Sequence, residues 1–244
     1  MSDFEDVSGF SADKLFEVGT DLDLEEFKEL FRHYYDELHK LDDLASGDQS
    51  VNVKIGSTPL HFAAKKGYLN AVHQLLEEGA DIEATDSEGW TALHFASDQG
   101  NAETVKMLLN KGGAPEATEA NGWDPIHCTA AADSPEVIEL LIEDGVRVDQ
   151  RDEQNKIPLH HAAARASINA AQALIDHGSE IDVQDDQGGT PLHPAAHFGN
   201  PEMVDFLIEE GADVSVEDIE GYTPLDIAKY HNHEKIINSM EEIA

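Results

Sequence analysis

A short motif, Thr-Pro-Leu-His in its most regular copies, recurs along this chain at a constant interval of 33 residues. Its six copies begin at Thr58, Thr91, Asp124, Ile157, Thr190 and Thr223, with no insertion or deletion between them. Such a regular period predicts identical structural units stacked in one direction, each in contact only with its neighbours.

The second copy shows how one unit is built. The run Asp86-Ser87-Glu88-Gly89 has the residue types of a tight turn. Thr91 is suited to cap a short helix from about Ala92 to Asp98. A second helix is expected from about Ala102 to Asn110, where the apolar residues share one face, and Gly112 suits its end. Each unit is therefore expected to be a turn followed by two short helices.

These motifs resemble those of the ankyrin repeat. The matching residues are Thr-Pro-Leu-His-x-Ala-Ala at 58–64, Gly-Ala-Asp at 79–81 and 211–213, and Asp-x-x-Gly at 86–89, 185–188 and 218–221. The resemblance implies an all-α solenoid of stacked helix-turn-helix units. β-Hairpin fingers would project from one side, and a concave face would be formed by the fingers and the first helices. It also implies that the motif histidines join neighbouring units through hydrogen bonds. We place the repeats at about 53–85, 86–118, 119–151, 152–184, 185–217 and 218–244.

Residues 1–50 do not follow the repeat and are expected to form an acidic, helical N-terminal cap. Asp23 and Glu26 can form a capping box at the start of a helix. Its apolar stripe would consist of Leu24, Phe27, Phe31, Tyr34, Leu38 and Leu41. Residues 51–54 are expected to be a finger strand that leads into the first repeat. The alternative role for this helix is to bind a partner.

The segment before this helix superficially resembles the exit of a calcium-binding EF-hand. If Glu26 were the last ligand, Leu15 and Gly19 would occupy positions where calcium needs side-chain oxygens. We therefore expect no calcium there.

The charge of the chain is strongly negative. Fifty-one acidic residues against 15 basic ones give a net charge of −36. Nucleic-acid phosphates and anionic lipid surfaces repel such a chain, so we expect neither as a partner. Two explanations stay open: the charge keeps the protein soluble, or it attracts a partner with a basic segment.

The sequence also bears on location. No run of 18 apolar residues predicts a membrane span, and the start of the chain has the features of neither a signal nor a transit peptide. A single cysteine, Cys128, agrees with a reducing compartment. We expect a cytoplasmic monomer, with nuclear localisation left open.

The search for chemistry predicts no catalytic residue, no metal site and no cofactor. His127 adjoins Cys128, but neighbours on a helix point about 100° apart and no orienting acid is evident. His231 and His233 lack a third ligand at a defined spacing for zinc.

The candidate binding residues come from two positions in each repeat, which the ankyrin family exposes. The position just before the motif holds Ser57, Trp90, Trp123, Lys156, Gly189 and Tyr222. The end of the first helix contributes Lys65, Lys66, Asp98, Arg165, Phe198 and Tyr230. Tryptophan and tyrosine dominate binding hot spots. We expect Trp90 and Trp123 to form a shallow apolar cleft beside Ala131 and Ala132, or else to pack on neighbouring fingers and stabilise the stack.

The finger tips are rich in acidic residues, which we expect to form a rim around this cleft. They are Asp86, Glu88, Glu119, Asp152, Glu153, Asp185, Asp186, Asp218 and Glu220. Such a rim would orient a basic partner. The first functional hypothesis is a non-enzymatic adaptor or scaffold that binds a protein on the concave face. The others are an acidic chaperone or inhibitor of a basic client and an enzyme with a hidden site.

Overall fold

The computed structural model describes residues 25–29, 32 and 56–242. Residues 56–242 form six helix pairs. The first helices of the pairs are α2 (Pro59–Lys66), α4 (Ala92–Asp98), α6 (Pro125–Ala131), α8 (Pro158–Arg165), α10 (Leu192–Phe198) and α12 (Pro224–Tyr230). The second helices are α3 (Leu69–Glu77), α5 (Ala102–Asn110), α7 (Pro135–Glu143), α9 (Ile168–Asp176), α11 (Pro201–Glu209) and α13 (Glu234–Glu241). The two helices predicted in the second copy agree with α4 and α5 in their bounds.

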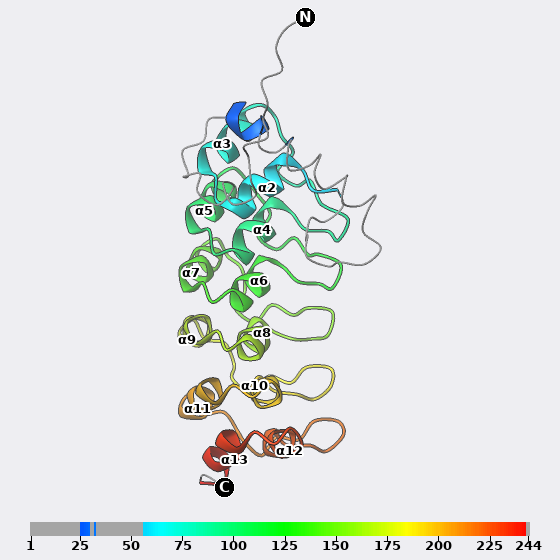
Figure 1. Ribbon diagram of the computed structural model, residues 1–244, viewed down its shortest axis with the longest axis vertical. Coiled ribbons are helices and arrows are strands. Elements are labelled where there is room, and N and C mark those ends of the chain that lie inside the picture. The colour runs from blue at the N-terminus through cyan, green and yellow to red at the C-terminus, as the bar shows by residue number, and fades with distance from the viewer. Residues whose placement is uncertain (1–24, 30–31, 33–55, 243–244) are drawn as a thin grey trace, which may run out of the picture.

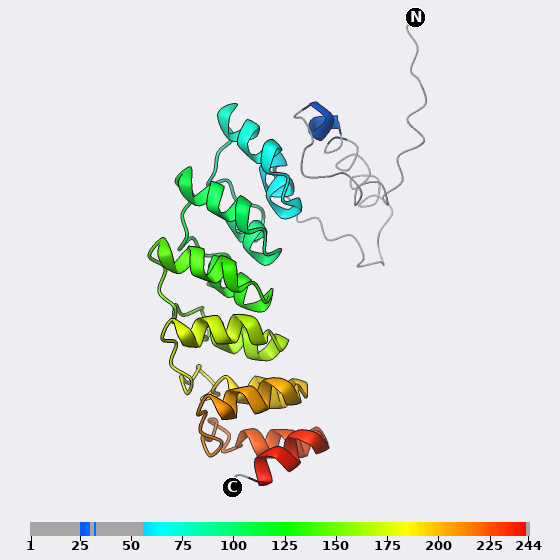
Figure 2. The same cartoon turned by 90° about the vertical axis from the view of Figure 1, so that its left-hand side faces the viewer.

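The pairs stack into a bent column. Figure 1 shows the first helices as one row and the second helices as a row beside it, with a loop projecting from each first helix. Figure 2 shows that the column curves along its length. First helices contact first helices of adjacent repeats from α2 to α12. The predicted all-α ankyrin solenoid is confirmed.

A continuous apolar core runs between the two rows. It includes Leu60, Leu93, Ile126, Leu159 and Leu192, one from each of the first five motifs. The first helices can approach closely because a small buried side chain recurs at each 33-residue step. These side chains are Ala63, Ala96, Thr129, Ala162, Ala195 and Ala228. The hydroxyl of Thr129, the one polar member, donates a hydrogen bond to the Pro125 carbonyl at 2.8 Å.

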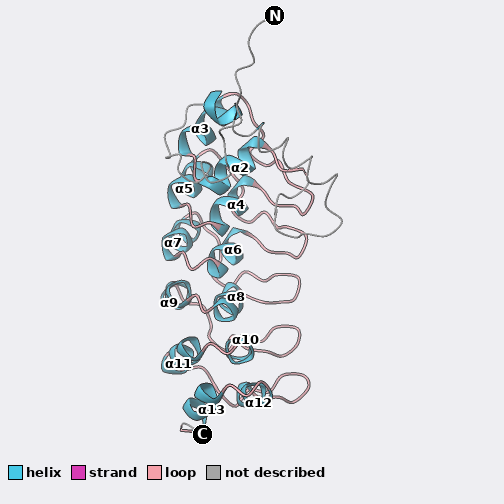
Figure 3. Cartoon of the chain, in the orientation of Figure 1, coloured by secondary structure: helices cyan, strands magenta, loops and turns pink. Residues whose placement is uncertain are grey.

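The fingers depart from the expected β-hairpins. Residues 56–242 contain no β-strand, and Figure 3 shows the fingers as loops. In the second repeat Asp86 N–H donates to Trp90 O at 3.0 Å. The return bond of a hairpin is missing, because Trp90 N–H donates instead to the Asp86 side chain at 2.9 Å. Single backbone bonds such as Ala120 N–H to Glu88 O, 2.9 Å, join one finger to the next.

The motif histidines join consecutive repeats, as the resemblance implied. His94 Nδ1 accepts a hydrogen bond from Thr91 N–H at 3.2 Å. Because a backbone N–H can only donate, this nitrogen carries no proton, and Nε2–H donates to the Trp123 carbonyl at 3.1 Å. His127, His160 and His193 make the same bond to the next finger. His160 and His193 also accept a backbone N–H at Nδ1, from Ile157 and Thr190, so these two and His94 are held in their neutral form.

Each first helix is followed by one residue in the left-handed conformation. These residues are Gly67, Gly100, Asp133, Ala166, Gly199 and Asn232. Asp133 compensates for its conformational cost, because its carboxylate accepts from Ala170 N–H at 2.9 Å and from the Asn169 amide at 2.8 Å. Ala166, with φ of 57°, has no side-chain polar group to do so.

We therefore expect Ala166→Gly to raise the free energy of unfolding by about 0.5–1 kcal/mol, since glycine adopts this conformation without steric cost. The matched change is Gly199→Ala, where an added Cβ would lie 2.6 Å from the His233 ring. That variant should lose stability. Urea unfolding of both variants measures the difference, and a destabilised Ala166→Gly would contradict this account.

At the N-terminal end of the column, Phe27 is fully buried in the described helical segment Glu25–Glu29. Its ring centroid lies 6.0 Å from that of Phe62 and 6.3 Å from that of Tyr68, both in the first repeat. Lys28 Nζ lies 3.1 Å from a carboxylate oxygen of Glu78. The rest of the predicted stripe (Leu24, Phe31, Tyr34, Leu38 and Leu41), Asp23 and the strand expected at 51–54 lie outside the described residues. The cap and its boundary at residue 50 stay predictions.

Candidate functional site

The position before each motif is fixed at the base of a finger by an acidic side chain. In the second repeat Asp86 Oδ1 accepts from the backbone N–H groups of Glu88 and Trp90, both at 2.9 Å. Glu119, Asp152, Asp185 and Asp218 hold their fingers in the same way. Asp86, Glu119 and Asp152 are buried. The expectation that these three form part of an acidic rim is therefore wrong: their carboxylates build the fingers.

Trp90 is half-buried, whereas the sequence suggested an exposed side chain. Its ring centroid lies 5.1 Å from that of Phe95 and 5.8 Å from that of His94, both on α4. Lys65, at the end of α2, places its Nζ 5.8 Å from the centroid of the same Phe95 ring. The end of one first helix and the finger base of the next repeat therefore meet at Phe95. We call the surface formed by the finger loops and the carboxyl-terminal ends of the first helices the finger face.

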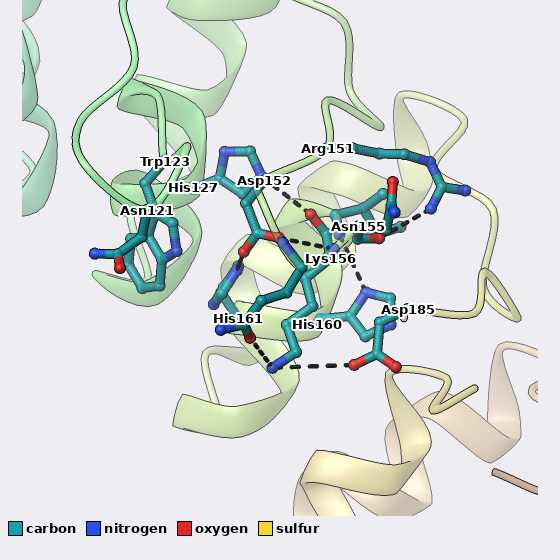
Figure 4. Close-up of polar contacts among 12 residues, drawn as sticks. Asn121, Trp123, His127, Arg151, Asp152, Asn155, Lys156, His160, His161 and Asp185 are labelled. Atoms are coloured by element: carbon teal, nitrogen blue, oxygen red, sulfur yellow. Dashed lines mark hydrogen bonds and ion pairs between the residues drawn. The ribbon is translucent and has the colours of Figure 1, made fainter. Parts of the chain in front are cut away.

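Trp123 is also half-buried, and it packs across a repeat boundary. Its ring centroid lies 4.1 Å from that of His161, on α8. His161 Nε2 lies 3.0 Å from Asp152 Oδ2, so it donates a hydrogen bond to this carboxylate. Figure 4 shows His161 between Trp123 and the Asp152 side chain. The three side chains connect the third finger to the fourth repeat.

Burial and hydrogen bonding act in opposite directions on the pKa values of His161 and Asp152. Burial lowers the pKa of His161, although the hydrogen bond to Asp152 opposes the shift. Burial alone would raise the pKa of Asp152, but hydrogen bonds from His161 and from the backbone N–H groups of Lys156 and Gln154 outweigh it and lower the pKa. Neutral His161 beside ionised Asp152 is therefore the stable pair at neutral pH. Trp123 therefore packs against a neutral imidazole.

The cationic candidates are partly engaged within the chain. Lys156 Nζ donates to Gln154 Oε1 at 2.8 Å and lies 3.9 Å from Asp185 Oδ2. Lys66 is half-buried, and burial, followed by repulsion from Lys65, lowers its pKa. Arg165 is exposed at the end of α8. Asp98, half-buried at the end of α4, accepts from the Gln99 amide at 2.7 Å.

The large exposed apolar side chains lie at the other end of the column. Within the described residues they are Phe198 (60% exposed), Ile219 (67%), Tyr222 (52%) and Tyr230 (82%). All four belong to the fingers or first-helix ends of the last two repeats. The predicted residues therefore recur repeat by repeat along the finger face from Lys65 to Tyr230. The shallow cleft expected at Trp90, Trp123, Ala131 and Ala132 stays a prediction.

Sequence reasoning missed several members of this surface. Ile219 was not a candidate, and His161 was hidden beside the motif residue His160. The histidines of the last two repeats also meet: the His197 ring centroid lies 4.5 Å from that of His231, which lies 5.7 Å from that of His233. The sequence signal that could have predicted this contact is that His197 and His231 are separated by about one repeat length, 33 residues.

The described part of the chain contains no group of three or more histidine, cysteine, aspartate or glutamate side chains placed to hold a metal ion. Cys128 is buried in the column. None of the helices in the described residues has the length and apolar character to cross a membrane.

Comparison with known proteins agrees with this architecture. A family model described as ankyrin repeats in three copies matches residues 29–119, 100–185 and 160–240. A stretch of 50 residues is 48% identical to the protein named Palmitoyltransferase AKR1 of Lachancea kluyveri, covering 19% of this chain and 7% of that relative. The similarity therefore concerns a small part of the relative. By its matched repeats the chain belongs to the ankyrin-repeat family, whose repeats form protein-interaction modules.

Proposed function

We propose that this chain is a non-enzymatic adaptor that binds a protein partner along the finger face. The main observation behind this proposal is that the large exposed apolar side chains lie on one side of the column. Phe198, Ile219, Tyr222 and Tyr230 all lie on the finger face. The second helices carry no large exposed apolar side chain within the described residues. Exposed aromatic residues gathered on one face are typical of binding surfaces, and tyrosine is enriched at their hot spots.

The two tryptophans support the same face from its middle. Each tryptophan is half-buried, because its ring packs against a side chain of a first helix, and this packing orders the ring while part of the residue stays accessible. A side chain that is already ordered loses little entropy on binding. Packing within the stack and binding to a partner are therefore compatible roles for Trp90 and Trp123.

We expect the double variant Trp90→Ala/Trp123→Ala to lose its partner. The change removes two ordered aromatic surfaces, so affinity should fall by at least about tenfold, equivalent to 1.4 kcal/mol. Affinity capture from cell extract with wild type and variant checks this. Circular dichroism must show that the variant is folded, because both rings also pack against histidines.

A matched control carries Lys106→Ala and Glu139→Ala, two exposed side chains on the second helices α5 and α7 of the same repeats. This control should capture the same partners as wild type. A folded tryptophan variant that keeps every partner would contradict a role for the middle of the finger face. Loss of partners by the control instead would move the binding surface to the second helices.

A second candidate function, chaperoning or inhibition of a basic client, is favoured by the net charge of −36. Glu88, Glu153, Asp186 and Glu220 remain exposed in the fingers. Salt separates the two functions, because screening weakens contacts between exposed charges more than apolar contacts. Partners that leave in high salt from wild type and tryptophan variant alike would favour the client-binding function.

A further inference from the structure

We propose that the last two repeats form a docking surface for a basic, arginine-bearing peptide segment, which is held while His197, His231 and His233 are neutral and released when they are protonated. This inference rests on the proposed function and names the partner chemistry for one end of the finger face. We call this surface the C-terminal patch: Phe198, Tyr222 and Tyr230, with the three histidines.

The rings of the patch at the ends of α10 and α12 form a continuous series of contacts. The His197 centroid lies 4.9 Å from that of Phe198 and 4.5 Å from that of His231. Tyr230 follows, with its centroid 5.1 Å from that of His231. His233 Nε2–H donates to the His197 carbonyl at 3.2 Å and so ties the end of α12 to α10. The exposed rings therefore rest on a fixed base.

Tyr222 extends the patch to the sixth finger. Its carbonyl accepts from His193 Nε2–H, on α10, at 3.3 Å, while its side chain is exposed. It precedes α12, and Tyr230 ends that helix. At 1.5 Å per residue, α12 separates the two tyrosines by about 10 Å along its axis. Such a span matches about three residues of an extended peptide.

Charge selects a basic occupant. Residues 185–244 contain 14 acidic residues and two basic ones, Lys229 and Lys235. Lys229 Nζ lies 2.8 Å from Glu241 Oε1, so its charge is paired. Glu217 and Glu220, in the loop before α12, and Asp226 of α12 are exposed and lie within five residues of Tyr222 in the sequence. A second copy of this chain is a poor occupant, because two chains of charge −36 repel each other.

Arginine fits the patch better than lysine. Its planar guanidinium can stack on an aromatic face and at the same time donate two parallel hydrogen bonds to a carboxylate. Exposed tyrosine rings next to exposed carboxylates offer both contacts. Arg165, exposed at the end of α8, lies at the same repeat position as Phe198, one repeat earlier. Its positive charge would repel a basic peptide, so the docking surface is expected to end before α8.

The histidines give the patch its pH dependence. His197, His231 and His233 lie within 6 Å of a neighbouring histidine ring, and the charged groups nearest in sequence are Asp226, Lys229 and Glu234. Burial, then repulsion from His231 and His233, lowers the pKa of His197. Protonation of this cluster in acid would add positive charge beside the Phe198 and Tyr230 rings that it contacts, and so would repel a guanidinium docked there.

The test uses a fluorescein-labelled 12-residue peptide in which arginine alternates with glycine and serine, and fluorescence anisotropy in 150 mM salt. Versions with lysine or glutamate in place of arginine are the matched probes. At pH 7.5 we expect the arginine peptide to bind at least threefold more tightly than the lysine peptide, and the glutamate peptide not to bind. Tyr222→Ala/Tyr230→Ala should weaken binding at least tenfold, whereas Lys106→Ala/Glu139→Ala, at exposed positions on the second helices, should change it less than threefold.

Acidification from pH 7.5 to pH 5.5 should weaken binding to wild type at least tenfold. The variant His197→Asn/His231→Asn/His233→Asn should lose most of this dependence, which separates the histidines from the carboxylates. If the arginine and lysine peptides bind equally well and the Tyr222→Ala/Tyr230→Ala variant binds them as wild type does, binding rests on charge attraction alone. That result would overturn the proposal. So would a persistent pH dependence in the histidine variant, or a dimer that covers the patch.

These outcomes are independent of the adaptor proposal. If the peptide does not bind to the wild-type protein, the C-terminal patch proposal is wrong, and partner capture sensitive to the tryptophans would still support an adaptor. If no partner is captured but the arginine peptide binds in a way that depends on Tyr222 and Tyr230, the C-terminal patch proposal is supported. The binding role proposed for Trp90 and Trp123 is then wrong.

Discussion

Replacing Asp152 by alanine is expected to lower the free energy of unfolding by about 3 kcal/mol, because three hydrogen bonds to a buried carboxylate are lost together. Asp152 Oδ1 accepts from Gln154 N–H at 2.8 Å and Lys156 N–H at 2.9 Å. Its Oδ2 accepts from His161. Truncation leaves these donors unpaired at a buried position and also releases His161, on which Trp123 packs. Urea denaturation measures the loss.

The matched control is Asp218→Ala in the sixth finger. Asp218 Oδ1 accepts from the backbone N–H groups of Glu220 and Tyr222, both at 2.9 Å, but the residue is half-buried and water can replace it. Its removal should cost less than about 1 kcal/mol. An equal loss in the two variants would show that the burial of Asp152 and its bond to His161 contribute nothing to stability.

The second large effect is a loss of stability in acid that arises from His160. His160 Nδ1 accepts from Ile157 N–H at 3.2 Å, and Nε2–H donates to the Gly189 carbonyl at 3.0 Å. Protonation of Nδ1 would break the first bond, and burial lowers the pKa of His160 from 6.5 to about 4. The unfolded chain therefore binds a proton at a higher pH than the folded chain does, so stability falls as the pH falls from about 6.5 towards 4.

For this shift, linkage predicts that His160 alone removes about 2 kcal/mol of stability between pH 7.5 and pH 5. The carboxylates of this acidic chain also respond to pH, so the comparison is with His160→Gln, which cannot titrate at this position. The stability difference between wild type and variant should shrink by about this amount on acidification. His177→Gln, at an exposed histidine, should follow wild type. A constant difference between wild type and His160→Gln would contradict the linkage.

The repeat itself could be predicted from the sequence, because its signals are local. A cap residue, a proline at the start of a helix and a glycine after its end act within a few residues. Repetition at a fixed step then allows one stacking arrangement, in which each unit covers the apolar face of the next. For these reasons the bounds of α4 and α5 and the role of the motif histidines were predicted correctly from the residues alone and their resemblance.

The binding surface was predicted less well, because exposure depends on contacts between repeats. Trp123 is half-buried by His161, 38 residues later, and Asp152 is buried with the same side chain. Asp86 has the same place in its finger, but Phe95 stands where the fourth repeat has His161, and Asp86 Oδ2 has no hydrogen-bond partner within the described residues. The acidic rim was predicted wrongly at Asp86, Glu119 and Asp152 because a carboxylate in a tight turn accepts the backbone N–H groups around it.

The sequence by itself determined the 33-residue period, the acidic charge and the helix pair of the second repeat, since all of these follow from composition and local pattern. Only the tertiary structure decided which side chains face solvent. Phe198, Tyr222 and Tyr230 are exposed while the equally aromatic Trp90 and Trp123 are half-buried. The physical reason is that burial depends on packing partners: Trp123 packs on His161 of the next repeat, and Trp90 packs on His94 and Phe95 of α4 in its own repeat.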